Sequence, residues 1–280
     1  TVRVPARFPV RAADRLREEG FTLVVSKEPF FPRRAVKTPE EILRIEAAQE
    51  ATEEVMLDAI EQIRRTEIRG DELHLDGETL TAERLKMRVR KLLLERGYNV
   101  GEIIVAPGDQ GCDPHNTGSG PLRAGETIII DIFPRHIENR YWGDMTRTVV
   151  KGEPSSELRK LHAAVEKAQR VALEEIGPGV RGADVHRKVS ESLEMDGFAT
   201  TCTNGTWKGF FHGTGHGVGL DIHEAPRLSK NGPVLEEGMV VTVEPGLYYP
   251  GLGGVRIEDL VVVTADGCRN LNRASRELVV

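Results

Sequence analysis

The sequence predicts an α/β fold made of two similar halves, and three observations support this prediction. Two predicted helices followed by predicted strands occur in the same order twice along the chain. The segment 122–131 (LRAGETIIID) aligns without a gap with the segment 235–244 (LEEGMVVTVE). The chain has 280 residues, of which 39% are hydrophobic, enough for one large domain or two ordinary ones.

The first half opens with a short helix predicted over 11–19 and a strand over 21–25, followed by Pro29-Phe30-Phe31-Pro32. Thr38-Pro39-Glu40-Glu41 then predicts a helix start, because it offers an N-cap, a proline in the first turn and acids at the positive end of the helix dipole. Apolar residues at helical spacing continue this helix to about Arg65; they are Ile42, Ile45, Ala48, Val55, Ala59 and Ile63.

A second helix is predicted from about Thr81 to Gly97, with strands over 102–105, 126–132 and 143–150. The second half repeats this order. Helices are predicted over 155–176, ended by Gly177-Pro178, and over 182–195, ended by Gly197. Strands follow over 239–244 and 254–263.

The repeat also places acidic residues at matched positions. In the gapless alignment Asp131 falls on Glu244, and each is followed by a second acid, Asp144 after 13 residues and Glu258 after 14. Two unrelated hairpins with common turn chemistry would give a similar pattern. However, Asp131 and Glu244 both end apolar runs, where an unpaired carboxylate is costly. A pseudo-twofold fold would gather all four acids in the centre.

Four carboxylates in one buried cluster repel each other and tend to protonate unless cations neutralise them. Two divalent ions supply the matching charge. An oxygen-rich set with one imidazole suits Mn, Co, Fe or Zn, and a pair of such ions is typical of hydrolases.

The imidazole is expected from the segment 212–226 (HGTGHGVGLDIHEAP). His212 and His216 have the spacing of a helical zinc pair, but the glycines at every second position disfavour a helix. The segment also lacks the GK[ST] motif that a phosphate-binding loop would have. The glycines favour instead an extended segment that other groups approach closely.

Composition excludes several classes of protein. The net charge of −6 and pI near 5.8 argue against general binding to nucleic acid or anionic membranes. No apolar run approaches ~18 residues, so no membrane span is expected. The N-terminal segment is too charged for a signal peptide, and three widely spaced cysteines fit reduced thiols, so a cytoplasmic protein is expected.

With these motifs the sequence resembles the pita-bread metallopeptidase family, which includes methionine aminopeptidases, Xaa-Pro aminopeptidases, prolidases and creatinases. The resemblance covers about residues 34–280. It implies a curved, mostly antiparallel sheet pair with helices outside and two divalent metal ions in the middle. It also implies five metal ligands: Asp131, the bridging Asp144, His216, Glu244 and the bridging Glu258.

The resemblance suggests roles for further residues. His115 and His223 are similar to histidines that contact the substrate or the tetrahedral intermediate, with ordinary loop histidines as the alternative. His212 is similar to a supporting histidine of the Xaa-Pro branch, and Glu244 is also a candidate proton shuttle.

Two arginines complete the candidate site. Arg256 lies two residues before Glu258, so in one strand both would face the same side, and it can hold a ligand carboxylate. The alternative is a solvated arginine. Arg227 falls where some prolidases grip the substrate's C-terminal carboxylate, but a surface ion pair is an equal alternative.

The implied activity is metal-dependent hydrolysis of the amide bond after the N-terminal residue of a short peptide. The HGxxH, EPGLY and RIED motifs favour proline at the second position, leaving dipeptidase and aminopeptidase P types open. The alternatives are an activity like that of methionine aminopeptidase and a non-enzymatic pita-bread binding protein. A metal-free creatinase-type hydrolase is disfavoured because all five ligands are present.

The expected domains are 1–33, the C-terminal remnant of an N-terminal creatinase-like α/β domain with its linker, and 34–280, the catalytic domain. Because such N-terminal domains often build dimers in the family, a homodimer is a candidate assembly. Ile132-Phe133 follows Asp131 where the family commonly has a small residue and glycine, which is expected to alter one pocket wall.

Overall fold

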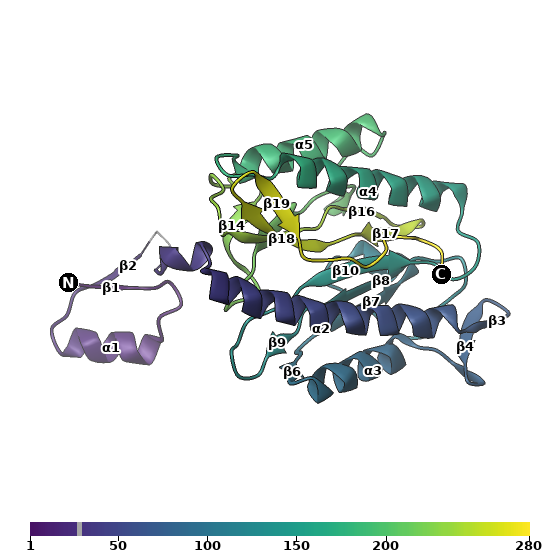
Figure 1. Ribbon diagram of the computed structural model, residues 1–280, viewed down its shortest axis with the longest axis horizontal. Coiled ribbons are helices and arrows are strands. Elements are labelled where there is room, and N and C mark those ends of the chain that lie inside the picture. Colours follow the sequence, from purple (N-terminus) through teal and green to yellow (C-terminus); the bar gives the residue numbers. More distant parts are fainter. Residues whose placement is uncertain (27–29) are drawn as a thin grey trace.

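The computed structural model describes residues 1–26 and 30–280 and has the expected α/β architecture of two halves (Figure 1). Each half has a pair of helices outside and a sheet inside. In the first half the helices are α2 (Pro39–Arg64) and α3 (Ala82–Glu95), and the sheet order is β10 (Met145–Val149), β8 (Ile128–Ile132) and β7 (Ile103–Pro107).

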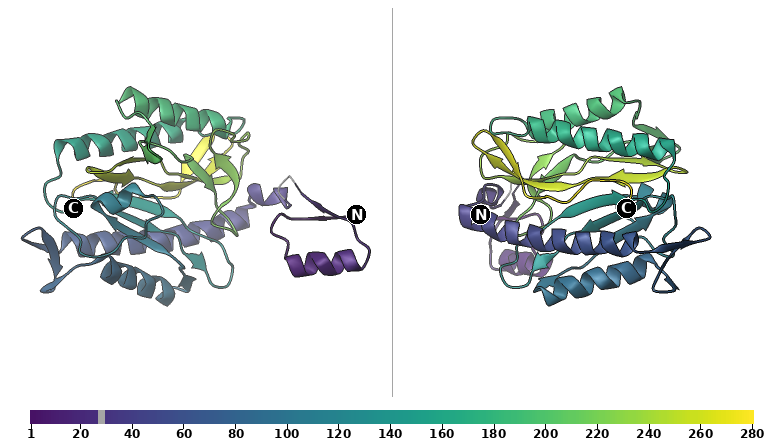
Figure 2. Two further views of the ribbon diagram at one scale, coloured as in Figure 1. Left: turned by 180° about the vertical axis from the view of Figure 1, so that it is seen from behind. Right: turned by 45° about the vertical axis from the view of Figure 1, so that its right-hand side comes forward.

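The second half has the helices α4 (Ser156–Glu175) and α5 (Gly182–Met195). Its five-stranded sheet runs in the order β14 (Glu224–Leu228), β13 (Gly215–Gly217), β15 (Val240–Val243), β18 (Asp259–Thr264) and β19 (Gly267–Asn270). A further hairpin of β16 (Gly246–Tyr249) and β17 (Gly253–Arg256) accompanies it. The strands of both halves lie between the two helix pairs, as Figure 2 shows from other directions.

Helix α2 begins where the sequence predicts, because its first turn is capped from both sides. The Thr38 hydroxyl accepts a hydrogen bond from the Glu41 amide at 3.3 Å, and the Glu41 carboxylate accepts one from the Thr38 amide at 2.8 Å. This reciprocal pair satisfies two amides that have no partner within the helix.

Strands β7 and β8 look uniformly apolar in sequence because both of their faces are buried. Alternate residues of the two strands pack against α2 and α3; they are Ile103, Val105, Ile128, Ile130 and Ile132. The other face carries Ile104, Ala106 and Ile129, which pack with Tyr248 between the two halves. Since side chains alternate along a strand, Asp131 falls on this inner face.

The predicted strand over 254–263 is wrong in one respect, because it is two strands. β17 pairs with β16, whereas β18 pairs with β15. Between them the Glu258 amide donates a hydrogen bond to the Thr146 carbonyl oxygen at 3.0 Å. The chain therefore changes partners at Glu258, and Arg256 and Glu258 do not share one strand.

Several strands of two to five residues were not predicted from the sequence, because so few residues give little periodicity to detect. They are β1 (Val2–Val4), β3 (Glu67–Arg69), β4 (Glu72–Leu75), β5 (Glu78–Thr79), β6 (Tyr98–Asn99), β9 (Arg135–His136), β11 (Thr201–Thr203), β12 (Thr206–Lys208), β13, β14, β16 and β19. Many of them are held by tertiary packing rather than by their own pattern.

The glycine-rich segment is extended around His216, as expected. A Cβ atom at Gly215 would lie 1.9 Å from the Thr242 carbonyl oxygen, and one at Gly217 would lie 2.2 Å from the Ala225 carbonyl oxygen. The neighbouring strands therefore approach β13 so closely that glycine is required on both sides of His216.

The N-terminal segment forms a small unit of its own at one end of the molecule (Figure 1). Helix α1 (Val10–Glu18) joins β1 to β2 (Leu23–Val25), and these two strands pair in parallel. Pro29, which the sequence places at the end of this unit, lies outside the described residues.

The segment that leads into α2 is anchored to the second half by charge. The Lys37 ammonium lies 2.9 Å from a carboxylate oxygen of Glu224, and both side chains are buried. Arg34 pairs with Glu224 as well, and with Asp221 at 2.9 Å. A buried pair of this kind holds the loop before β14 against the start of α2.

The three cysteines are free thiols. Within 1–26 and 30–280 we find no helix with the length and apolar character needed to cross a membrane.

Two glycines with left-handed backbone allow a test of the packing around β7. Gly118 has φ +77° and a Cβ there would lie 1.7 Å from the Val105 carbonyl oxygen, whereas Gly120 has φ +79° and open space around it. We expect Gly118→Ala to lower the free energy of unfolding by about 3 kcal/mol or more, and Gly120→Ala by about 1 kcal/mol. Denaturant unfolding of both variants measures the difference, and equal losses would contradict the close packing at Gly118.

Candidate metal centre

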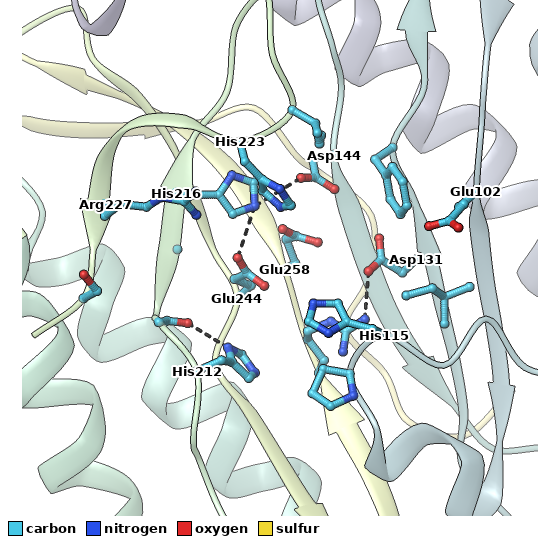
Figure 3. A pocket seen from close by; sticks show the side chains of 18 of the residues that line it. Glu102, His115, Asp131, Asp144, His212, His216, His223, Arg227, Glu244 and Glu258 are labelled. Atoms are coloured by element: carbon cyan, nitrogen blue, oxygen red, sulfur yellow. Dashed lines mark hydrogen bonds and ion pairs between the residues drawn. The ribbon is translucent and has the colours of Figure 1, made fainter. Parts of the chain in front are cut away.

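A cavity of about 740 Å³ lies between the two halves and contains every candidate site residue named from the sequence. Strands of both halves provide its walls (Figure 3). The acidic residues expected as ligands lie at or near strand ends: Asp131 lies in β8, Asp144 precedes β10, Glu244 follows β15 and Glu258 joins β17 to β18. His216 is the middle residue of β13.

The fold brings these five side chains together from distant parts of the sequence. Ligand atoms of Asp144, His216 and Glu258 all lie within 4.8 Å of one another. The His216 Nε2 atom is 3.3 Å from a Glu244 oxygen and 3.6 Å from an Asp144 oxygen. The pseudo-twofold arrangement expected from the internal repeat therefore places two acids from each half around one centre.

The protein provides little positive charge to balance the negative charge of these carboxylates. Burial, followed by repulsion from neighbouring acids, raises the pKa of Asp144 and of Glu258 well above the ordinary range. Burial likewise raises the pKa of Glu244 to about 7. Among the described residues, one Asp131 oxygen is buried and accepts no hydrogen bond.

These observations fit a site for divalent cations. Buried acids with raised pKa values and a vacant acceptor atom gain most from added positive charge. Carboxylate oxygens with one imidazole match the ligand preferences of Mn, Co, Fe and Zn. The donor set of this chain is therefore suited to divalent metal ions.

His216 is oriented for ligation through Nε2. Its Nδ1 atom lies 3.2 Å from the Gly217 carbonyl oxygen, which fixes the proton on that nitrogen. Burial lowers the pKa of His216 to about 3, so the ring is neutral. The Nε2 lone pair consequently faces Asp144 and Glu244.

Two threonines hold carboxylates of the centre from behind. Thr146 donates a hydrogen bond to Glu258 at 2.7 Å, and Thr242 donates one to Glu244 at 3.1 Å. Each hydroxyl occupies one lone pair of a ligand carboxylate and leaves the others directed to the cavity.

Two glutamines, which sequence reasoning missed, fasten the backbone of the acids to the outer helices. Gln49 in α2 donates to the Asp144 carbonyl oxygen and accepts from the Asp144 amide, both at 2.8 Å. Gln169 in α4 donates to the carbonyl oxygens of Val243 and Ile257, at 3.1 and 3.3 Å, the residues just before Glu244 and Glu258. A glutamine within the apolar stripe of each helix was the available signal.

A chain of hydrogen bonds links His212 to Asp131. The His212 Nε2 atom lies 2.8 Å from the Tyr248 hydroxyl, Arg256 donates to that hydroxyl at 3.1 Å, and Arg256 also donates to Asp131 at 2.8 Å. Burial lowers the pKa of His212 to about 3 and raises the pKa of Tyr248 to about 12, so His212 is neutral and Tyr248 keeps its proton.

This series of hydrogen bonds defines the surroundings of His212, Arg256 and Tyr248. The Nδ1 atom of His212 lies 2.8 Å from the Gly213 carbonyl oxygen, so both ring nitrogens have partners within the protein. His212 is therefore a positioning residue rather than a free acid or base. Arg256 is buried and not solvated, and the buried Tyr248 joins it to His212.

The remaining candidates line the open side of the cavity. His223 is exposed and its ring centroid lies 4.3 Å from that of His216, and His115 is exposed on the loop before β8. Arg227 is exposed in β14, and within the described part of the chain it forms no ion pair, so the surface ion pair considered from the sequence is not formed there. Phe133 lines the cavity, as expected from its place after Asp131.

The model of metallopeptidase family M24 matches residues 44–265, a range that holds all five candidate ligands. The chain belongs to this family. An Xaa-Pro dipeptidase from Pyrococcus furiosus is 35% identical over 250 residues, covering 88% of this chain and 65% of that protein's length. The chain thus spans just under two thirds of this relative.

Solved structures agree with the family and with the pita-bread fold. The prolidase from Pyrococcus furiosus superposes with a TM-score of 0.83 at 31% identity, over 98% of this chain and 76% of that one. An X-Pro aminopeptidase from Thermotoga maritima superposes with a TM-score of 0.82 at 29% identity, over 99% of this chain and 75% of that one.

The raised pKa of Glu244 predicts an unusual pH dependence for metal-free protein. A carboxyl whose pKa rises from 4.5 to about 7 on folding binds its proton more tightly in the folded state. The free energy of unfolding should therefore fall as pH rises through this window, by up to about 3 kcal/mol. Unfolding of chelator-treated protein between these pH values measures the fall. Glu244→Gln should make it smaller by the share of Glu244, while Asp144 and Glu258, whose pKa values are also raised, keep the rest.

Saturating divalent metal should also remove most of this pH dependence, because the ions compensate the ionised carboxylates. A stability of metal-free protein that increases with pH would contradict the electrostatic account.

Proposed function

We propose that this chain carries the catalytic part of a two-metal exopeptidase that hydrolyses the bond between an N-terminal residue and proline in a short peptide. The observation that carries the proposal is the meeting of all five ligand side chains in one cavity of an M24 family member. The Xaa-Pro preference is supported by the names of the similar proteins, an Xaa-Pro dipeptidase and an X-Pro aminopeptidase.

In this proposal the metal ions are held by the five ligands Asp131, Asp144, His216, Glu244 and Glu258. Mn, Co, Zn and Fe are the candidate ions. When bound, such ions neutralise the carboxylates, polarise the scissile carbonyl group and make water a better nucleophile at neutral pH.

The protein's own side chains handle the proton and the developing charge. Glu244 lies at the centre of the cavity and accepts a proton from the attacking water, then returns it to the leaving nitrogen. Partial burial of the His223 ring, and then the neighbouring Arg227, lower the pKa of His223, which favours the neutral ring. A neutral ring can donate a hydrogen bond to the carbonyl oxygen as negative charge develops. His115 donates from the opposite side of the cavity.

Arg227 provides a cation for the substrate's C-terminal carboxylate. It lies at the edge of the cavity, and no acidic partner among residues 1–26 and 30–280 occupies its guanidinium group. A planar guanidinium can bind a carboxylate through two parallel hydrogen bonds. This favours dipeptides over longer peptides.

We further propose that 34–280 is the catalytic domain and that 1–33 belongs to a separate N-terminal α/β unit. The separate pairing of β1 with β2 and the start of the family match within α2 support this division.

The proposed chemistry predicts that Asp144→Ala lowers hydrolysis of Leu-Pro by at least about 1,000-fold and lowers the bound metal from two ions to one or fewer. Metal analysis and kcat/KM with Mn²⁺ measure both. Asp14→Ala, in the N-terminal unit, is the matched control. Full activity with two ions retained in Asp144→Ala would overturn the assignment.

The role of Arg227 predicts a split between substrates. Arg227→Met should lower kcat/KM for Leu-Pro by about 30-fold while changing Leu-Pro-Gly less than about threefold, since a tripeptide places its carboxylate elsewhere. The control is Lys230→Met, which removes an exposed cation nearby in the sequence. Equal losses on both substrates would argue against carboxylate recognition, and preferential cleavage of Met-peptides would favour the methionine aminopeptidase alternative.

A further inference from the structure

Glu102 is an acidic side chain of the cavity that the proposed hydrolytic chemistry does not use. It lies just before β7, it is exposed, and it lines the same cavity as the metal ligands. Within the described part of the chain it forms no ion pair and no side-chain hydrogen bond. Its carboxylate is therefore available to a substrate.

The register of the first sheet shows where Glu102 lies relative to the metal centre. Ile103 pairs with Ile132 and Ile104 pairs with Asp131, so Glu102 stands opposite Phe133 as this ladder continues. Because side chains alternate, Glu102 shares a face with Ile104, and Phe133 shares a face with Asp131. All four of these residues line the cavity.

Glu102 and Arg227 lie at opposite ends of the cavity. In Figure 3 Arg227 stands on one side, Glu102 on the other, and the ligand carboxylates of Asp144 and Glu258 between them. The cavity thus has a cationic end, a metal centre and an anionic end. If Arg227 binds the carboxyl end of a dipeptide, the N-terminal residue lies toward Glu102.

We propose that Glu102 is a specificity-determining residue that favours substrates with lysine or arginine before the scissile bond. This inference rests on the proposed function. The methylene groups of such a side chain would lie along Ile104 and Phe133, which form an apolar wall, and its charged end would reach Glu102. The site thereby combines apolar contact with one charge of the opposite sign.

The size of the effect follows from the exposure of Glu102. An ion pair between solvent-exposed groups contributes little, on the order of 1 kcal/mol, which corresponds to about a fivefold change in kcat/KM. The preference should decrease as salt is added, since screening weakens exposed pairs.

The test compares Lys-Pro with norleucine-Pro, whose side chain has the same stem without the charge. Wild-type protein loaded with Mn²⁺ should cleave Lys-Pro about fivefold better in kcat/KM. Glu102→Gln should abolish this ratio and leave norleucine-Pro unchanged. Glu138→Gln, which removes an exposed acid that does not line the cavity, should keep the ratio.

Two outcomes would overturn the proposal. An unchanged ratio in Glu102→Gln would show that its charge does not select the side chain. Equal losses on both dipeptides would place Glu102 against the substrate's α-amino group or in a structural role.

Binding separates this inference from the proposed function. Non-cleavable reduced-bond analogues of the two dipeptides are titrated calorimetrically into wild type and Glu102→Gln. If wild type hydrolyses neither dipeptide, the proposed function fails, but tighter binding of the lysine analogue that depends on Glu102 would still support the inference. Equal binding of both analogues by wild type would overturn it.

Discussion

The structure depends on one electrostatic constraint, which is that four carboxylates from two halves of the chain share one buried cavity. Loss of hydration, followed by mutual repulsion, raises the pKa values of Asp144, Glu244 and Glu258. Such a cluster costs folding free energy unless cations enter it. Metal binding and folding of this region are consequently coupled.

The protein meets this constraint by fastening the backbone rather than by pairing every charge. Gln49 and Gln169 reach from α2 and α4 to the main chain at or just before three of the acids. Of the four acids of the candidate metal centre, Asp131 alone forms an ion pair with an arginine or lysine of the described residues, and its partner is Arg256. The remaining carboxylates are thus held in place while keeping oxygens free for ions.

The same architecture makes the two ends of the cavity chemically different. The central strands of the two sheets, β8 and β15, end at the candidate metal centre. Residues near these strand ends therefore form the walls of the cavity. Arg227 lies in β14 at one end of the cavity, and Glu102 lies just before β7 at the other end. The ionic anchor between Lys37 and Glu224 holds the loop that carries His223 close to the start of α2.

The sequence by itself determined the two-half α/β fold and the main helices, because capping and helical periodicity are local signals and the internal repeat is visible without a structure. It also named the five candidate ligands, through the repeat of acidic residues and the family resemblance. It did not reveal the break in the strand at Glu258, since changing strand partners depends on the position of Thr146 in the other half. It also did not show how His212, expected as a supporting histidine, is connected to the acids of the site. Tyr248 hydrogen-bonds to both His212 and Arg256, and Arg256 donates to Asp131 of the other half. This last contact forms only after both halves have packed. Tertiary structure alone decided which side chains face the cavity, because β7 and β8 are apolar on both faces and their pattern does not distinguish inside from outside.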